Sequence, residues 1–142
     1  MFSVLVQNMI EQYDYPVLTE ETLGEFLESS EGVVLFFTED AKKFPETNDV
    51  AMILPELVGA FNGRFSAAVI AMPDQRKLQM HYGFREWPTL VFLRNGEYLG
   101  AISRVQDWND YLEKISQILA SEPTKAPDFM LPVSGSGAGC SA

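Results

Sequence analysis

Short apolar runs alternate along this chain with longer segments whose apolar residues recur every three or four positions. Val33 to Phe37 is a continuous run of strand-forming residues, as in a central strand buried on both faces. Phe65 to Met72 and Thr89 to Leu93 are predicted as further strands. The longer segments have the spacing of helices that cover a sheet, so the order of elements predicts an α/β fold.

Helices are predicted over Phe2 to Tyr13, Thr19 to Ser29, Val50 to Phe61, Pro73 to Tyr82 and Asp107 to Leu119. The inward-facing residues expected in the first of these are Val6, Met9, Ile10 and Tyr13, and those in the last are Trp108, Leu112, Ile115 and Leu119. Thr19 and Asp107 are predicted to cap their helices. Residues 38–49 are polar and include Pro45, so they predict a loop.

Asn95-Gly96 is the signal for a two-residue hairpin, because both residues tolerate a positive φ. The strand Thr89 to Leu93 is therefore expected to pair antiparallel with Tyr98 to Ile102. Pro88 stands directly before this hairpin, and a proline lacks the N–H and fixes φ. A proline there fits an edge position, a strand start or a cis peptide bond in a tight turn.

The segment from Gly32 to Leu119 resembles a thioredoxin. The resemblance is carried by the strand Val33 to Thr38, by Met52-Ile53-Leu54-Pro55-Glu56-Leu57, which looks like the thioredoxin helix with its internal proline, and by the proline hairpin. It implies a thioredoxin-like fold, in which a central mixed β-sheet is flanked by helices. It also implies that the Trp87-Pro88 peptide bond is cis.

The redox dithiol of a thioredoxin is missing from this chain. Cys140 is the one cysteine, and a reducible couple needs two sulfurs within bonding reach. Phe36 stands where thioredoxins usually have a buried Asp that handles protons for the thiols. The resemblance therefore implies the fold without the redox chemistry.

A chain of 142 residues fits a single domain. Residues 1–120 are predicted as the thioredoxin-like domain, with an acidic helical segment at the N-terminal end. Residues 121–142 hold three Pro, three Gly and four Ser without a period, so they predict a disordered tail. Residues 1–10 hold no Lys or Arg and an interrupted apolar run, so we expect no signal peptide or membrane span and a cytoplasmic protein.

The net charge of -10 is unevenly distributed along the chain. Residues 1–41 hold nine acidic groups and no basic one, whereas residues 42–142 hold eleven acidic and ten basic groups. Such a field repels nucleic acid and favours a cationic partner, with an attraction that weakens as salt rises. A solvated helical face that keeps the protein in solution is the alternative explanation.

The chain offers little material for catalysis or metal binding. His81 is the only histidine and has no cysteine nearby, so we expect it on a helix surface. Lys42-Lys43 is expected to be a solvated pair in the loop, because no Gly-rich phosphate cradle precedes it. We therefore expect no catalytic residue, no metal and no cofactor.

Beyond thioredoxins in general, residues 1–120 resemble the HupG/HyaE family of hydrogenase expression and maturation proteins. The shared features are the acidic N-terminal segment, VVLFF followed by the thiol-free loop TEDAKKFPETNDV, and YGFREWPTLVFLRNGEYLGAI before an amphipathic helix. The resemblance implies a non-catalytic cytoplasmic chaperone, which binds the twin-arginine signal peptide of a nickel-iron hydrogenase small-subunit precursor before export. Other hydrogenase maturation proteins are further candidate partners.

The partner site is predicted at Trp87-Pro88, because in a thioredoxin-like fold the residue before the cis proline presents its backbone to an extended peptide. A twin-arginine segment is cationic and then apolar, so it needs acids beside an apolar groove. The acids expected to meet its arginines are Glu39, Asp40, Glu46, Asp49 and Glu86.

Three alternatives to this interpretation stay open at the level of sequence. Trp87 is either an anchor for a partner or ordinary packing that covers the long loop. The domain is either this chaperone or a redox-inactive thioredoxin-like domain that binds another protein. An enzyme such as a transferase or peroxidase would need a reactive thiol or a cofactor site, and the sequence shows neither.

Overall fold

The computed structural model describes residues 1–127. Its elements in chain order are α1 (Val4–Tyr13), β1 (Val17–Leu18), α2 (Glu20–Ser29), β2 (Gly32–Phe37), α3 (Glu46–Ala60), β3 (Ser66–Ile70), α4 (Met72–Tyr82), β4 (Thr89–Arg94), β5 (Glu97–Ser103) and α5 (Trp108–Ala120). From residue 128 onward the predicted tail, with Cys140, lies outside the described residues. Among residues 1–127, no helix is long and apolar enough to cross a membrane.

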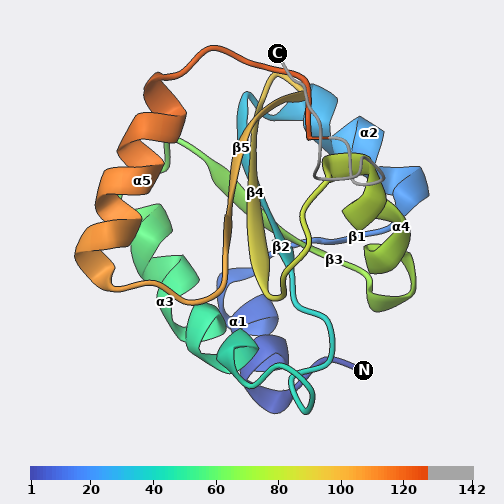
Figure 1. Ribbon diagram of the computed structural model, residues 1–142. Coiled ribbons are helices and arrows are strands. Elements are labelled where there is room, and N and C mark those ends of the chain that lie inside the picture. Colours follow the sequence, from blue (N-terminus) through green and yellow to red (C-terminus); the bar gives the residue numbers. More distant parts are fainter. Residues whose placement is uncertain (128–142) are drawn as a thin grey trace, which may run out of the picture.

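The five strands form one mixed sheet in the order β1-β3-β2-β4-β5. The first three strands in this order run parallel, and β4 and β5 are joined antiparallel (Figure 1). The hairpin turn lies at Asn95 and Gly96, where φ is 53° and 81°, as their sequence predicts. The mixed sheet and the hairpin therefore agree with the sequence-based expectation.

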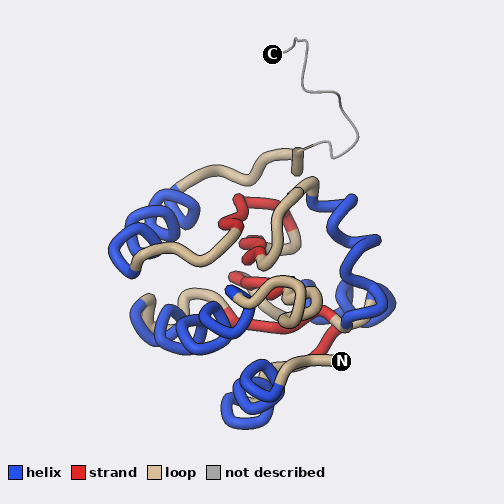
Figure 2. Tube along the Cα trace, turned by 60° about the horizontal axis from the view of Figure 1, so that its bottom comes forward, coloured by secondary structure: helices blue, strands red, loops and turns tan. Residues whose placement is uncertain are grey.

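Helices cover both faces of the sheet, so that the molecule has three layers (Figures 1 and 2). Val34 and Phe36 of β2 belong to the apolar cluster shared with α1, α3 and α5. The alternate residues Val33, Leu35 and Phe37 belong to the cluster shared with α2 and α4. All five side chains are at most 1% exposed. The uninterrupted apolar run in the sequence is thus explained by burial on both faces.

Residues 38–45 form the predicted loop, but α3 begins at Glu46, so the prediction that residues 46–49 belong to the loop and that the helix starts at Val50 was wrong. The acidic groups of Glu46 and Asp49 lie in the first turn, where the free N–H groups of a helix favour negative charge. Thr47 is fully buried and donates to the carbonyl oxygen of Thr38 at 2.6 Å. Tertiary hydrogen bonding therefore accounts for the polar residues that suggested a loop.

The buried stripe of α5 consists of Tyr111, Ile115 and Leu119. Trp108 was predicted to face inward, and this was wrong, because its side chain is 39% exposed. Trp108 precedes Tyr111 by three residues and is rotated by about 60° around the helix from it. Asp107 occupies the N-cap position as predicted, but its side chain makes no capping hydrogen bond.

At the end of α1, Tyr13 was also predicted to face inward. This was wrong, because Tyr13 is 47% exposed and its ring stacks on that of Tyr15, with centroids 5.7 Å apart. Tyr13 is the last residue of the helix. The stack on Tyr15 therefore takes the place of contact with the sheet.

Residues 121–127 run from the end of α5 past β5 to α4. The N–H of Thr124 donates to the carbonyl oxygen of Tyr98 at 2.9 Å. Gly83 ends α4 with a φ of 74°, and a Cβ atom there would lie 1.9 Å from the carbonyl oxygen of Pro127. Glycine is required at this position by both the backbone angle and the close approach.

Candidate binding site

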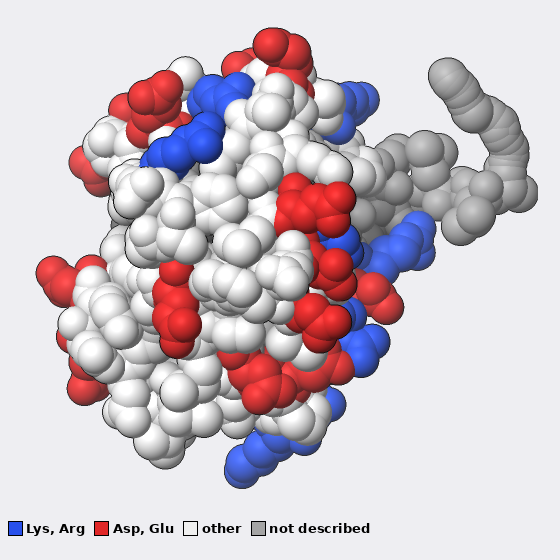
Figure 3. Space-filling model, turned by 90° about the vertical axis from the view of Figure 1, so that its left-hand side faces the viewer, with Lys and Arg blue, Asp and Glu red and all other residues white. Residues whose placement is uncertain are grey.

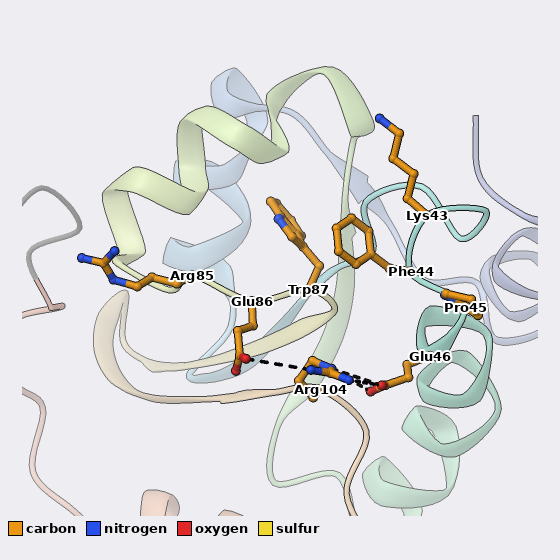
Figure 4. A pocket seen from close by; sticks show the side chains of 8 residues that line it. All are labelled: Lys43, Phe44, Pro45, Glu46, Arg85, Glu86, Trp87 and Arg104. Atoms are coloured by element: carbon orange, nitrogen blue, oxygen red, sulfur yellow. Dashed lines mark hydrogen bonds and ion pairs between the residues drawn. The ribbon is translucent and has the colours of Figure 1, made fainter.

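The strand register brings two segments together that are about 40 residues apart in the sequence. Phe37 at the end of β2 lies opposite Thr89 at the start of β4. The residues that follow Phe37 therefore meet the turn that precedes Thr89. Between them lies a hollow of ≈ 460 Å³ (Figure 4). The hollow is lined by Lys43, Phe44, Pro45, Glu46, Arg85, Glu86, Trp87 and Arg104.

Trp87 forms part of the wall of this hollow. The Trp87-Pro88 peptide bond is cis, as the resemblance implies. The indole is only 6% exposed, because it packs edge to face against Phe84 with ring centroids 5.2 Å apart and lies 6.5 Å from Phe44. The side chain is thus largely committed to packing and presents only a limited surface to the hollow.

Arg76 of α4 covers the Trp87 ring and holds one of the predicted acids. Its guanidinium carbon lies 5.8 Å from the ring centroid, in a cation-π arrangement. The same guanidinium pairs with Glu39 at 2.5 Å. The backbone of Glu39 has a φ of 48°, and its N–H donates to the buried side chain of Gln75 at 2.6 Å. Glu39 therefore lies beside Trp87 but is already paired with an arginine of this chain.

Arg104 lies between Glu46 and Glu86, the two acids of the hollow (Figure 4). Its Nε atom donates to both carboxylate oxygens of Glu46 at 3.1 Å, and its Nη2 atom makes a shorter hydrogen bond to Oε2. Its Nη1 atom lies 3.9 Å from Glu86. Glu46 and Glu86 thus share one guanidinium, with Glu46 holding it more closely.

Hydrogen bonds of the backbone hold Glu46 and Arg104 in place. The N–H of Arg104 donates to the carbonyl oxygen of Pro88 at 2.7 Å. The N–H of Val105 donates to Oε1 of Glu46 at 2.8 Å. The hydrogen bonds from Arg104, and then that from Val105, lower the pKa of the Glu46 carboxyl below its ordinary value. Glu46 is therefore held in its charged form and also anchors the loop after β5.

Three of the predicted acids, Glu39, Asp40 and Asp49, do not line the hollow. Asp40 accepts a hydrogen bond from the N–H of Lys42 at 2.9 Å and borders a separate, smaller hollow at the N-terminal residues. Asp49 is exposed on the first turn of α3. Of the predicted residues, the structure brings Glu46, Glu86 and Trp87 to the hollow, with Pro88 following Trp87 in the chain. Glu39 instead pairs with Arg76, whose guanidinium lies over the indole.

Arg76 and Arg104 are not among the residues that the sequence predicts for the site. A signal for Arg104 exists, because the hairpin pairs Thr89 with Ser103 and so places Arg104 opposite Pro88. The register shift between Phe92 and Leu93 moves this pairing by one residue. Counting residues outward from the turn at Asn95-Gly96 therefore gives the wrong residue opposite Pro88.

The hollow combines apolar side chains with ion-paired acids, a combination that can bind a partner. Among the described residues, no group of three or more His, Cys, Asp or Glu side chains could hold a metal ion. His81 is exposed on α4, as expected for a surface residue. Acidic side chains are spread over the face formed by α3 and α5, and basic ones lie toward its margins (Figure 3). On this face, acidic side chains therefore lie among a mostly uncharged surface (Figure 3).

Comparison with known proteins gives a family. The family model described as Hydrogenase-1 expression protein HyaE matches residues 5–111. The chain is 46% identical over 127 residues to the hydrogenase expression/formation protein HoxO of Azotobacter vinelandii, covering 89% of this chain and 85% of that protein. It is 43% identical over 97 residues to the hydrogenase expression/formation protein HupG of Bradyrhizobium diazoefficiens, covering 68% and 66%.

Solved structures agree with this result. The crystal structure of hupG from Rhodopseudomonas palustris is 40% identical, covers 74% of this chain and 95% of that one, and superposes with a TM-score of 0.53. A thioredoxin from Halobacterium salinarum covers 77% and 93% with a TM-score of 0.60. At 20% identity, this second similarity shows the fold alone. The predicted thioredoxin-like fold and the predicted family are both confirmed.

Proposed function

Because the chain belongs to the HyaE/HupG/HoxO family of hydrogenase expression proteins, we propose that it is a non-catalytic chaperone in hydrogenase maturation. Its partner is the twin-arginine signal peptide of a nickel-iron hydrogenase small-subunit precursor, which it binds in the cytoplasm before export. Other hydrogenase maturation proteins are further partners. The observation that carries the proposal is the pair of acids, Glu46 and Glu86, which already holds one arginine side chain beside an apolar wall.

The chemistry of the hollow matches the order of residues in such a peptide. A carboxylate accepts two parallel hydrogen bonds from a guanidinium, which a lysine cannot supply. Phe44, Pro45 and Trp87 line the same hollow and offer apolar contact to the residues that follow the arginines. Aromatic side chains at such positions contribute strongly to interfaces.

The backbone at the cis proline supports binding of an extended peptide. The N–H and C=O groups of Trp87 make no hydrogen bond with any other residue in the range 1–127. The two groups can therefore form hydrogen bonds with the main chain of an extended peptide, in the way that a strand is added to a sheet.

The charge distribution supports a cationic partner as well. The nine acidic groups and absence of basic groups in residues 1–41 give the N-terminal part a strong negative field. Such a field accelerates association with a cationic segment, and the effect weakens as salt rises. The proposed site itself carries mixed charge, so the long-range field attracts the peptide and the local acids select arginine.

Peptide titration by calorimetry tests the proposal. The probe is a synthetic twin-arginine signal peptide, with its arginines intact or changed to Lys, at two salt concentrations. Glu86→Gln removes an acid that is 61% exposed, and we expect about tenfold weaker binding, since a hydrogen bond to a charged group contributes on the order of 1.5 kcal/mol. Glu97→Gln, in the hairpin at the other end of β5, is the matched control with the same change of charge.

The outcomes separate the possible sites. Equal affinity for both variants, together with indifference to Arg→Lys in the peptide, would show that the hollow is not the site. A loss confined to variants of Glu20 and Glu21 would move the site to α2. Capture of the small-subunit precursor with its signal peptide, but not of a precursor without it, separates this function from that of a thioredoxin-like domain with another partner.

A further inference from the structure

We propose that Arg104 is a built-in competitor, which occupies the place of a partner's arginine until a cationic segment exchanges with it. The inference rests on the proposed function, because it concerns how the same hollow admits its ligand. It adds that the site is filled by the protein's own side chain in the free state and that binding begins with displacement of that side chain.

The first argument is that the guanidinium of Arg104 makes the contacts that an incoming arginine would make. It is bound by both oxygens of Glu46 and lies 3.9 Å from Glu86. These are the two acids of the hollow. An arginine from a partner can form paired hydrogen bonds with Glu46 only if Arg104 gives up its own, because both oxygens of that carboxylate already accept from Arg104 (Figure 4).

The second argument is that Arg104 can leave without unpacking the protein. Its side chain is 51% exposed. By contrast, Arg94 is partly buried and donates to the carbonyl oxygens of Leu119 and Ser121 at the end of α5. Arg94 completes the hydrogen bonding of a helix end, whereas Arg104 pairs with side chains at the rim of a hollow.

The third argument is that the backbone around Arg104 stays fixed when the side chain moves. The N–H of Arg104 remains bonded to Pro88, and Glu46 remains bonded to the N–H of Val105. The loop after β5 and the acid therefore keep their places during the exchange. Glu86 is the natural point of entry, because its contact with Arg104 is the longer one and it is 61% exposed.

Self-occupancy sets a threshold for binding. The apparent affinity of a ligand falls in proportion to the fraction of molecules whose site is open. This factor is the same for an arginine and for a lysine ligand, so the preference for arginine comes from its paired hydrogen bonds to a carboxylate. The competitor therefore lowers the affinity of every cationic segment equally, and only a segment of high intrinsic affinity, such as one with two arginines, still binds at low concentration.

Removal of the competitor gives the test. Arg104→Met is compared with Arg64→Met, which removes the same charge at the opposite end of β2, where the Arg64 carbonyl adjoins Gly32. With the synthetic twin-arginine peptide, we expect Arg104→Met to bind about two- to fivefold more tightly than Arg64→Met, the range that partly exposed ion pairs supply. Arg104→Lys is expected to lie between Arg104→Met and the wild type.

A second measurement follows the side chain in the wild-type protein, so that a folding defect of a variant does not decide the matter. The nitrogen-15 signal of the Arg104 Nε–H group reports its hydrogen bonds to Glu46. We expect saturating peptide to shift this signal to the position of a solvated arginine. The signal of Arg94, which is bonded to helix carbonyls, is the internal control and is expected to stay.

Each result decides between the proposals. Equal affinity of Arg104→Met and Arg64→Met, with an unmoved Arg104 signal, overturns the exchange and leaves the proposed function standing. Weaker binding by Arg104→Met also overturns it, because Arg104 would then be a contact for the peptide. No binding by any variant or by the wild type overturns the proposed function, and the exchange with it.

Discussion

The buried amide of Gln75 holds the segment that leads from β2 into the binding site. Gln75 is 1% exposed. Its Oε1 atom accepts from the N–H of Glu39 at 2.6 Å, and its Nε2 atom donates to Oγ1 of Thr38 at 3.0 Å and to the carbonyl oxygen of Ile70 at 2.8 Å. One side chain therefore ties the end of β2 to the end of β3.

Gln75→Met keeps the length of the side chain and removes all three hydrogen bonds. The Glu39 N–H and the Ile70 carbonyl each lose a partner, and a buried polar group without one costs about 1 to 3 kcal/mol. Glu39 is only partly buried, so water recovers some of this loss. We expect the free energy of unfolding to fall by about 2 to 4 kcal/mol, a large part of the usual 5 to 15 kcal/mol of a domain.

Urea denaturation followed by circular dichroism measures this change. The control is Gln117→Met on the exposed face of α5, for which we expect a change within about 0.5 kcal/mol. Amide exchange at Glu39 is a local second reading and should become faster in Gln75→Met alone. A change below about 1 kcal/mol, with an unaltered slope and unaltered exchange at Glu39, would refute the role assigned to this network.

Three further predictions follow from single features. Gly32→Ala should lower the melting temperature, because its Cβ would lie 2.3 Å from the Arg64 carbonyl oxygen. Gly24→Ala on α2 meets nothing within 4 Å and should stabilise the protein by about 0.5 to 1 kcal/mol. Equal changes in the melting temperature of the two variants would contradict the packing at Gly32. Burial raises the pKa of Tyr82 and of Tyr111 to about 12. Because the folded state holds these protons more tightly, their stabilisation is complete below pH 10 and is lost as pH rises toward 12; ionisation of either ring near pH 10 in the folded protein, followed by the NMR signals of that ring, would refute it. Neither the wild type nor Cys140→Ser should accelerate the reduction of insulin disulfides, since the chain has one thiol for a reaction that needs two; turnover that Cys140→Ser abolishes would disprove this.

The parts of the fold that sequence predicts well are those decided by local pattern. The apolar run from Val33 to Phe37 and the turn at Asn95-Gly96 carry their own signals, and the structure has the expected strand and hairpin there. The start of α3 was misplaced because Thr47 and Asn48 bond to Thr38 and Ser3, which are 9 and 45 residues away. Partners at such separations are set by the folded chain and leave no local trace.

The candidate site was predicted only in outline, for a similar reason. Topology alone indicates that the segment after β2 meets the turn before β4, and Glu46 and Glu86 do meet there. Sequence could not show that Arg76 and Arg104 pair with Glu39 and Glu46, because these contacts depend on side chains from α4 and from the loop after β5. Three of the five predicted acids, Glu39, Glu46 and Glu86, are thus paired with arginines of the protein itself.

The burial of Trp87 gives the molecule an optical reporter of its own site. The chain has two tryptophans, and Trp108 is 39% exposed on α5, while Trp87 is 6% exposed and lines the hollow. Trp108→Phe therefore leaves Trp87 as the single tryptophan, in the wall of the hollow. Because Arg76 lies over that ring, a ligand that moves the cation or excludes water changes the emission, and binding can be followed without a dye or a tag.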